Sequence, residues 1–215
     1  INAGIVKDVS SKLLKSSPDT ILIVVSNPMD TMTYLVHKTT GVSKNRIIGM
    51  GGALDSARFK YRLAEALNAP ISDVDGMVIG GHSDKGMVPL ISKATRNSIK
   101  VTNFLSDEKL NQVREDTKVG GATLTKLLGT SAWYAPGAAV SSLVHSIACN
   151  HNKVFPCSAF LDGEYGLSDL CIGVPVVLGK NGIEEIIELE LNPEDLAQLS
   201  ESADGVKKTN SLLSL

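Results

Sequence analysis

Apolar positions at the start of the chain recur at helical spacing and then gather into a short continuous run. Residues 2–16 carry apolar side chains about one helical turn apart, which predicts an amphipathic helix. Residues 20–25, a threonine followed by five aliphatic residues, show no polar alternation, which is typical of a strand buried on both faces of a parallel sheet. A helix over 29–39, a strand over 46–50 and a helix over 56–67 continue the alternation. This rhythm predicts a partial doubly wound α/β layer.

The pattern changes after residue 70, where short strands and long helices replace the regular alternation. The predicted elements are strands at 77–80, 87–90, 99–101, 154–161 and 171–178, helices at 107–128 and 135–149, and a tight turn at 180–182 whose second arm returns over 182–189. Asn192 and Pro193 predict the N-cap and first residue of a last helix. We therefore expect two domains, an α/β part over 1–69 and an α+β part over 70–215.

Composition and charge exclude several classes of function. The chain has 215 residues with a net charge of −2, and no basic cluster suggests a nucleic-acid partner. No apolar run is long enough for a membrane span. The odd set of Cys149, Cys157 and Cys171 has no C-x-x-C spacing, which predicts reduced, buried thiols in a cytosolic protein and no metal site. The first residue is Ile1 in what reads as the middle of a helix, so we expect the chain to continue a longer gene product.

His82 is the leading candidate for acid–base chemistry. It follows an apolar strand and two glycines, which let a substrate approach the ring closely. An imidazole exchanges a proton near neutral pH. The alternative is a histidine that only caps the end of a strand. Histidines 37, 145 and 151 have no comparable neighbours and are left to structural roles.

Asp55 and Arg58 lie three positions apart at a predicted helix start and therefore share one face. Asp55 could orient and charge His82, and the Arg58 guanidinium could hold a substrate carboxylate through two parallel hydrogen bonds. The alternative is an ordinary acid at a helix start, paired with its neighbour. The functional set suits the interconversion of a 2-hydroxy acid and a 2-oxo acid.

Asn27 ends the first predicted strand. Ligands of doubly wound sheets bind beyond the carboxyl ends of strands, so Asn27 could contact substrate or cofactor. The alternative is that Asn27 and Pro28 only turn the chain. Glycines 49, 51 and 52 do not form the G-x-G-x-x-G fingerprint, which is absent from the sequence, and we expect them to leave room for a ligand.

Four segments, in this order along the chain, together resemble the lactate/malate dehydrogenase family and, within it, the malate-type members. They are V-S-N-P-M-D at 25–30, G-M-G-G-A-L-D-S-A-R-F at 49–59, G-G-H-S-D at 80–84 and S-A-W-Y-A-P at 131–136. The resemblance extends over essentially the whole chain. It implies that residues 1–69 are the second half of a Rossmann NAD-binding domain and that residues 70–215 are the catalytic domain.

The resemblance also implies roles for individual residues. The expected activity is NAD-dependent interconversion of malate and oxaloacetate, with His82 as the proton donor and acceptor and Asp55 as its partner. Arg58 and Asn27 are expected to bind substrate, and Asn27, Met50 and Ser131 to contact the cofactor. A homo-oligomer, dimer or tetramer, in the cytoplasm is implied as well.

The sequence departs from the family pattern in two ways. Family members read H-G-D-T-M-V-P where this chain has one more residue after His82. The family's opening third, with its glycine-rich turn and substrate-selecting arginines, has no match. We therefore expect the chain alone to bind NAD weakly, to be inactive, and to associate through the exposed edge of strand 20–25. A lactate or other 2-hydroxy-acid dehydrogenase, and a non-catalytic oligomerising fragment, are the alternatives.

Overall fold

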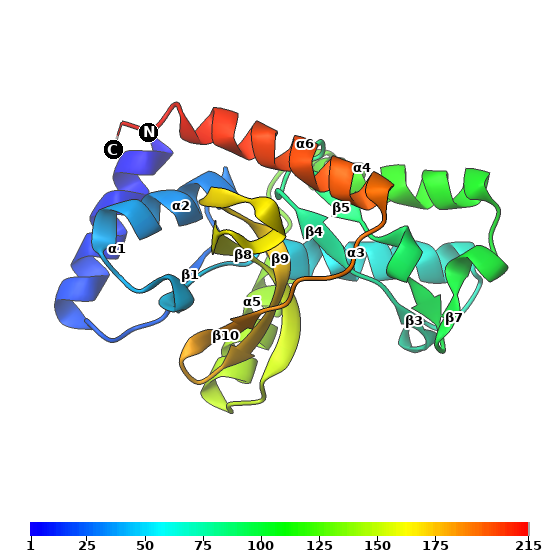
Figure 1. The fold of residues 1–215 in the computed structure, drawn as a ribbon, viewed down its shortest axis with the longest axis horizontal. Helices are drawn as coiled ribbons and strands as arrows, with labels where there is room; N and C mark the ends of the chain where they lie inside the picture. The colour runs from blue at the N-terminus through cyan, green and yellow to red at the C-terminus, as the bar shows by residue number, and fades with distance from the viewer. Residues whose placement is uncertain (215) are drawn as a thin grey trace.

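A mixed sheet with helices around it forms the centre of the molecule (Figure 1). The computed structural model describes residues 1–214. The seven-stranded sheet has the order β1-β2-β8-β9-β4-β5, with β10 on β9. Its strands are β1 (Leu22–Val24), β2 (Ile47–Gly49), β4 (Val78–Gly80), β5 (Met87–Pro89), β8 (Lys153–Asp162), β9 (Ser168–Gly179) and β10 (Gly182–Ile186). A smaller sheet has the order β3-β6-β7, from β3 (Val74–Asp75), β6 (Thr95–Arg96) and β7 (Ile99–Lys100).

Six α-helices are present in the described part of the chain. They are α1 (Asn2–Ser16), α2 (Met29–Thr40), α3 (Gly51–Ala66), α4 (Asp107–Leu128), α5 (Tyr134–Ala148) and α6 (Pro193–Asn210). Helix α6 begins as predicted, because the Asn192 side chain accepts a hydrogen bond from the Asp195 amide and Pro193 occupies the first turn. It crosses the upper side of the molecule in Figure 1. None of these helices is both long and apolar enough to cross a membrane.

The predicted fold class is confirmed, and a single sheet joins its two parts. Strands β1 and β2 pair in parallel, as the α/β pattern predicts. Strand β2 then pairs antiparallel with β8 through Gly49 and Ser158. The remaining pairs of the large sheet are antiparallel. The continuous sheet places the end of β2 beside the core of the α+β part.

The hairpin of β8 and β9 is the centre of the hydrophobic core. Residues 170–176 of β9 are buried without interruption, as expected for a strand covered on both faces. Helices α2, α5 and α6 all contact this strand. Because catalytic loops need a rigid support, the elements around this hairpin are suited to hold a site.

Helix α3 begins earlier than predicted. It starts at Gly51, so Asp55 and Arg58 lie inside the helix and not at its start. The two glycines at its N-terminus lower helix propensity, but close packing compensates. A Cβ at Gly51 would meet Met29 and His82, and one at Gly52 would lie 2.8 Å from the Pro156 carbonyl oxygen. Tertiary contacts therefore set this boundary, and the local sequence signal does not.

The cysteines follow the prediction in part. All three are free thiols. Cys157 and Cys171 are buried in the sheet, and burial raises the pKa of both thiols. Cys149 is exposed after the end of α5, so the expectation that it is buried is wrong.

Strand β1 lies at the edge of the large sheet, as the sequence predicts. It pairs with β2 only among the described strands, and Val25 beside it is 42% exposed. Because an open edge favours pairing with another chain, we expect light scattering to give a mass above the 22.7 kDa of one chain. Val25→Lys places a charge at this edge and should restore the monomer. A monomeric unchanged chain would contradict this prediction.

Candidate active site

His82 lies in a tight loop between β4 and β5. The loop closes through hydrogen bonds from the Ser83 amide to the Gly81 carbonyl, 2.8 Å, and from the Gly86 amide to the Ser83 carbonyl, 2.9 Å. Gly80 has a φ of +85°, and a Cβ there would meet the Gly86 carbonyl oxygen. β4 and β5 stay in register on either side. The turn therefore accommodates the additional residue after His82.

Two further helices hold this loop by side-chain hydrogen bonds. The Ser202 hydroxyl of α6 accepts from the Gly81 amide at 2.8 Å and donates to the Gly86 carbonyl at 2.7 Å. The Asp30 carboxylate of α2 accepts from the His82 amide at 2.6 Å through Oδ2. These bonds fix the backbone on both sides of the imidazole. Neither Ser202 nor Asp30 was predicted to belong to the site from the sequence.

The His82 ring contacts the buried carboxylate of Asp55. Nδ1 lies 2.6 Å from Asp55 Oδ2, and the side chains are 16% and 2% exposed. A neutral ring that donates from Nδ1 keeps its lone pair on Nε2, so Nε2 is the atom able to exchange a proton with substrate. Burial is the largest single influence on the pKa of His82 and lowers it. The hydrogen bond and charge of Asp55 and the charge of Asp30 raise this pKa, and together they outweigh burial. The net pKa is raised, which favours the imidazolium.

Arg58 lies on the same helix and contacts the other oxygen of Asp55. Its Nη1 donates to Asp55 Oδ1 at 3.1 Å, and its side chain is 21% exposed. A Cβ at Gly121 of α4 would lie 3.1 Å from Nη1 and 3.2 Å from Nη2. The absence of a side chain at Gly121 therefore leaves space for the guanidinium. One carboxylate thus links a proton-transfer group to a partly exposed cation.

Three further residues were predicted to contact substrate or cofactor. Asn27 is exposed at the end of β1, and its carbonyl oxygen accepts from the Asn2 side chain at 2.7 Å. Met50 is 3% exposed and packs in the core at the start of α3. Ser131 lies in the exposed segment between α4 and α5, where its carbonyl oxygen accepts from the Trp133 amide at 3.1 Å. The predicted cofactor contacts of Met50 and Ser131 stay predictions.

The glycines at the end of β2 have a structural role. A Cβ at Gly49 would meet Met29 and Thr33 of α2 and Ser158 of β8. A Cβ at Gly51 would meet Met29 and the His82 side chain. The space that the sequence analysis reserved for a ligand is therefore filled by the protein's own side chains.

Asp30 is a buried carboxyl that sequence reasoning missed. Burial raises its pKa more than the Ser158 hydroxyl and the His82 amide lower it. The available signal was an acid in the first helical turn, three residues after Asn27, where the helix dipole favours negative charge. Its contact with the His82 backbone joins the start of α2 to the loop between β4 and β5.

We expect Asp30→Ala to lower the free energy of unfolding by about 1–3 kcal/mol, because it leaves the partly buried His82 amide without an acceptor. Asp30→Asn keeps an acceptor oxygen and should cost less. Urea unfolding of the two variants measures the difference. Equal stability of both variants and the unchanged chain would contradict this role.

A large hollow lies apart from these polar side chains. It has a volume of about 750 Å³ and is lined by Ala53 and Ala57 of α3, Ala138 of α5 and Pro156 of β8. Neither His82 nor Arg58 lines it. The candidate site is therefore identified by the polar side chains described above and not by this hollow.

Sequence comparison decides the family. Residues 1–49 match the NAD binding domain of lactate/malate dehydrogenase, and residues 52–212 match its alpha/beta C-terminal domain. The chain belongs to the lactate/malate dehydrogenase family. A malate dehydrogenase of Bacteroides thetaiotaomicron is 62% identical over 213 residues, which is 99% of this chain and 68% of that protein.

Solved structures of the family have the same fold. The malate dehydrogenase from Salinibacter ruber is 43% identical with a TM-score of 0.94, over 98% of this chain and 68% of that one. A lactate dehydrogenase from Cryptosporidium parvum, complexed with lactic acid and nicotinamide adenine dinucleotide, is 33% identical with a TM-score of 0.95, over 98% and 68% of the two chains. The described residues thus share the backbone arrangement of malate and lactate dehydrogenases.

Proposed function

We propose that this chain carries the catalytic residues of an NAD-dependent malate dehydrogenase. The observation that carries the proposal is the connected set of His82, Asp55 and Arg58, in which one buried carboxylate bonds the imidazole at 2.6 Å and the guanidinium at 3.1 Å. This set combines a proton-transfer group with a cation for a carboxylate. The 62% identity to a malate dehydrogenase favours malate over the lactate alternative.

In the proposed mechanism, Arg58 orients the substrate and His82 moves the proton. The Arg58 guanidinium pairs with the substrate carboxylate and places the 2-carbon oxygen near His82 Nε2. In malate oxidation, neutral His82 accepts the hydroxyl proton at Nε2. In oxaloacetate reduction, the imidazolium returns that proton. Asp55 stabilises the charged ring in both directions and fixes its tautomer.

The residues present fit the nicotinamide end of NAD. Asn27 is exposed at the carboxyl end of β1, where ligands of such sheets bind, and Asp30 on the following helix holds the His82 backbone. A bound cofactor would take up the hydride of the 2-carbon as NAD⁺ and would supply it as NADH. Asn27 would then bond the nicotinamide or the reacting oxygen. Residues 1–49 match the NAD-binding domain.

The test follows NADH absorbance after oxaloacetate is added to the purified chain, with pyruvate as the parallel control. Turnover with oxaloacetate alone, lost in His82→Asn, supports the proposal. Without turnover by the chain itself, the same assay is run on the chain extended at its N-terminus with the unmatched segment of the Bacteroides relative. An extended chain that stays inactive would favour a non-catalytic oligomerising fragment. Turnover with pyruvate alone would favour a lactate dehydrogenase.

Arg58→Lys tests the carboxylate contact. We expect KM for oxaloacetate to rise at least about tenfold, since a hydrogen bond to a charged group contributes about 1.5–3 kcal/mol and lysine cannot pair in the same two-point way. Steady-state kinetics in an active preparation measures the change. Arg62→Lys is the matched control, because Arg62 lies one turn further along α3 and pairs with Glu65. An unchanged KM in Arg58→Lys would remove Arg58 from the substrate site.

We also propose a cytoplasmic homo-oligomer. Three free cysteines without a disulfide suit a reducing compartment. The open edge of β1 supplies a surface for association. The light-scattering measurement of the chain and of Val25→Lys tests whether the chain associates through this edge.

A further inference from the structure

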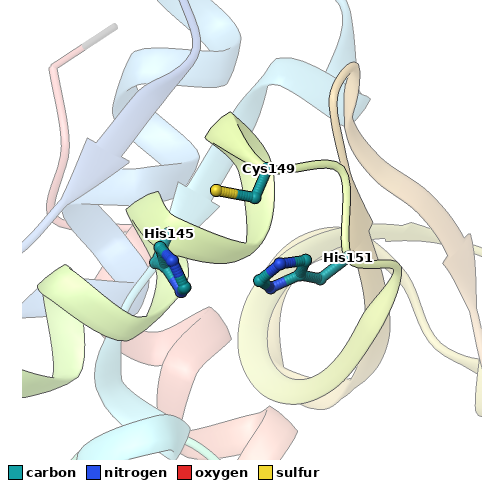
Figure 2. A group of neighbouring side chains, drawn as sticks. All are labelled: His145, Cys149 and His151. Carbon is teal, nitrogen blue, oxygen red and sulfur yellow. The ribbon is translucent and has the colours of Figure 1, made fainter.

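Three side chains of types that can bind a metal ion lie together at the end of α5, and none of them belongs to the proposed active site. His145, Cys149 and His151 each offer one ligand atom, and these atoms lie within 4.8 Å of one another. Figure 2 shows the two imidazoles side by side, with the Cys149 side chain one helical turn from His145. From the sequence, both histidines were expected to have structural roles, and no metal site was predicted. The fold gives them the neighbours that the sequence spacing concealed.

Local backbone geometry brings the three side chains together. His145 and Cys149 are four residues apart, so they project from the same face of the helix. The chain then reverses, because Asn150 has a φ of +50° and the His151 amide donates to the Ser146 carbonyl at 2.9 Å. The reversal sets the His151 ring against that of His145, with centroids 4.8 Å apart and planes at 84°. The hydrogen bond to Ser146 holds the His151 backbone against the end of α5.

Two imidazole nitrogens and one thiolate form a donor set for a borderline divalent ion. Zinc takes such ligands at about 2.0–2.1 Å from nitrogen and about 2.3 Å from sulfur, in tetrahedral geometry. Those bond lengths require ligand atoms about 3.4–3.6 Å apart. The present ligand atoms lie within 4.8 Å of one another, and all three side chains are exposed, so a change of rotamer can close the remaining gap. We propose that His145, Cys149 and His151 bind one zinc ion, with water in the fourth position.

Zinc at this position would join the end of α5 to the segment that enters β8. An ion that binds only the folded chain raises its stability by mass action. It would also bind the only exposed thiol among the three cysteines, since Cys157 and Cys171 are buried. The site is therefore expected to increase the melting temperature and to slow the reaction of Cys149 with thiol reagents.

Titration of the metal-free chain with Co²⁺ as a spectroscopic probe tests the site. We expect one equivalent to bind with a thiolate-to-cobalt charge-transfer band in the near ultraviolet, and one equivalent of Zn²⁺ to remove that band. Cys149→Ser should abolish the band, and His151→Gln should weaken binding at least tenfold. Ser142→Ala is the matched control, because Ser142 is exposed one turn earlier on α5. His82→Asn controls for the other histidine site, and neither control should alter the titration.

A second readout does not depend on cobalt. The rate at which a chromogenic disulfide reagent labels the native chain reports Cys149, and equimolar Zn²⁺ should lower that rate. The same zinc should raise the melting temperature of the chain and of Ser142→Ala but not of His151→Gln. The proposal is overturned if the band persists in Cys149→Ser, if metal binds only at millimolar concentration, or if zinc leaves the labelling rate unchanged.

Discussion

Replacing His82 with asparagine should lower kcat for oxaloacetate reduction by about 10²–10⁴-fold, the contribution typical of general acid–base catalysis. The reason is geometric, because His82 is the group whose Nδ1 is held by Asp55 at 2.6 Å while Nε2 remains for substrate. Asparagine can still bond the carboxylate, but it cannot exchange a proton near neutral pH. NADH oxidation measured at saturating oxaloacetate gives the change directly in any preparation that turns over.

The KM for oxaloacetate should change far less than kcat in His82→Asn, because Arg58 and its partner Asp55 remain in place. His37→Gln on α2 is the control, since His37 packs on Phe160 with ring centroids 3.9 Å apart and takes no part in the proposed site. It should keep the kcat of the unchanged chain. An active His82→Asn variant with an unaltered pH profile would assign proton transfer to another group.

The sequence predicts the regular elements well because their signals are local. Helix α4 has its predicted bounds, and α6 begins at the predicted cap, since periodicity and capping act within a few residues. The start of helix α3 was predicted at Ser56, whereas the helix begins at Gly51, because Gly51 and Gly52 weaken the local helical signal. The contacts of these glycines with Met29, His82 and Pro156 come from distant parts of the chain.

In the candidate site, too, local spacing predicts some contacts, and others form only between distant parts of the chain. Asp55 and Arg58 are one helical turn apart, so their shared face follows from spacing. The contact of Asp55 with His82 joins residues 27 positions apart, and that of Asp30 with the His82 amide joins residues 52 positions apart. Ser202 lies 121 positions from the Gly81 amide that it accepts from. Only folding brings such pairs together. The family resemblance implied the pair of Asp55 and His82, and it did not imply the contacts of Asp30 or Ser202.

Replacing Asp55 with asparagine should lower turnover by at least about 10²-fold, near the lower limit for loss of acid–base function. The change removes the charge that stabilises the imidazolium and the acceptor that fixes the tautomer. An asparagine amide that donates to Nδ1 would place the ring proton on Nε2, so neutral His82 could no longer accept a proton there. Arg58 would lose its charged partner as well.

The pKa of His82 should fall in Asp55→Asn. In the unchanged chain, burial lowers this pKa, the hydrogen bond and charge of Asp55 raise it, and the net shift is upward. Removing the carboxylate charge leaves burial less opposed, so the imidazolium deprotonates at lower pH. Reduction of oxaloacetate needs the imidazolium. As the pH is raised, the rate of reduction by the variant should therefore begin to fall at a lower pH than the rate of the unchanged chain. The residual oxidation of malate, which needs the neutral ring, should begin at lower pH.

Proton NMR of the His82 ring across pH measures this pKa without any need for turnover. Asp84→Asn is the matched control, because Asp84 is exposed in the same loop and its replacement removes one charge without touching the Asp55 contact. It should leave the His82 titration nearly unchanged. A drop of equal size in Asp84→Asn would mean that loop charge in general sets the pKa. A drop confined to Asp55→Asn would trace the raised pKa to the buried carboxylate and link it to the loss of turnover.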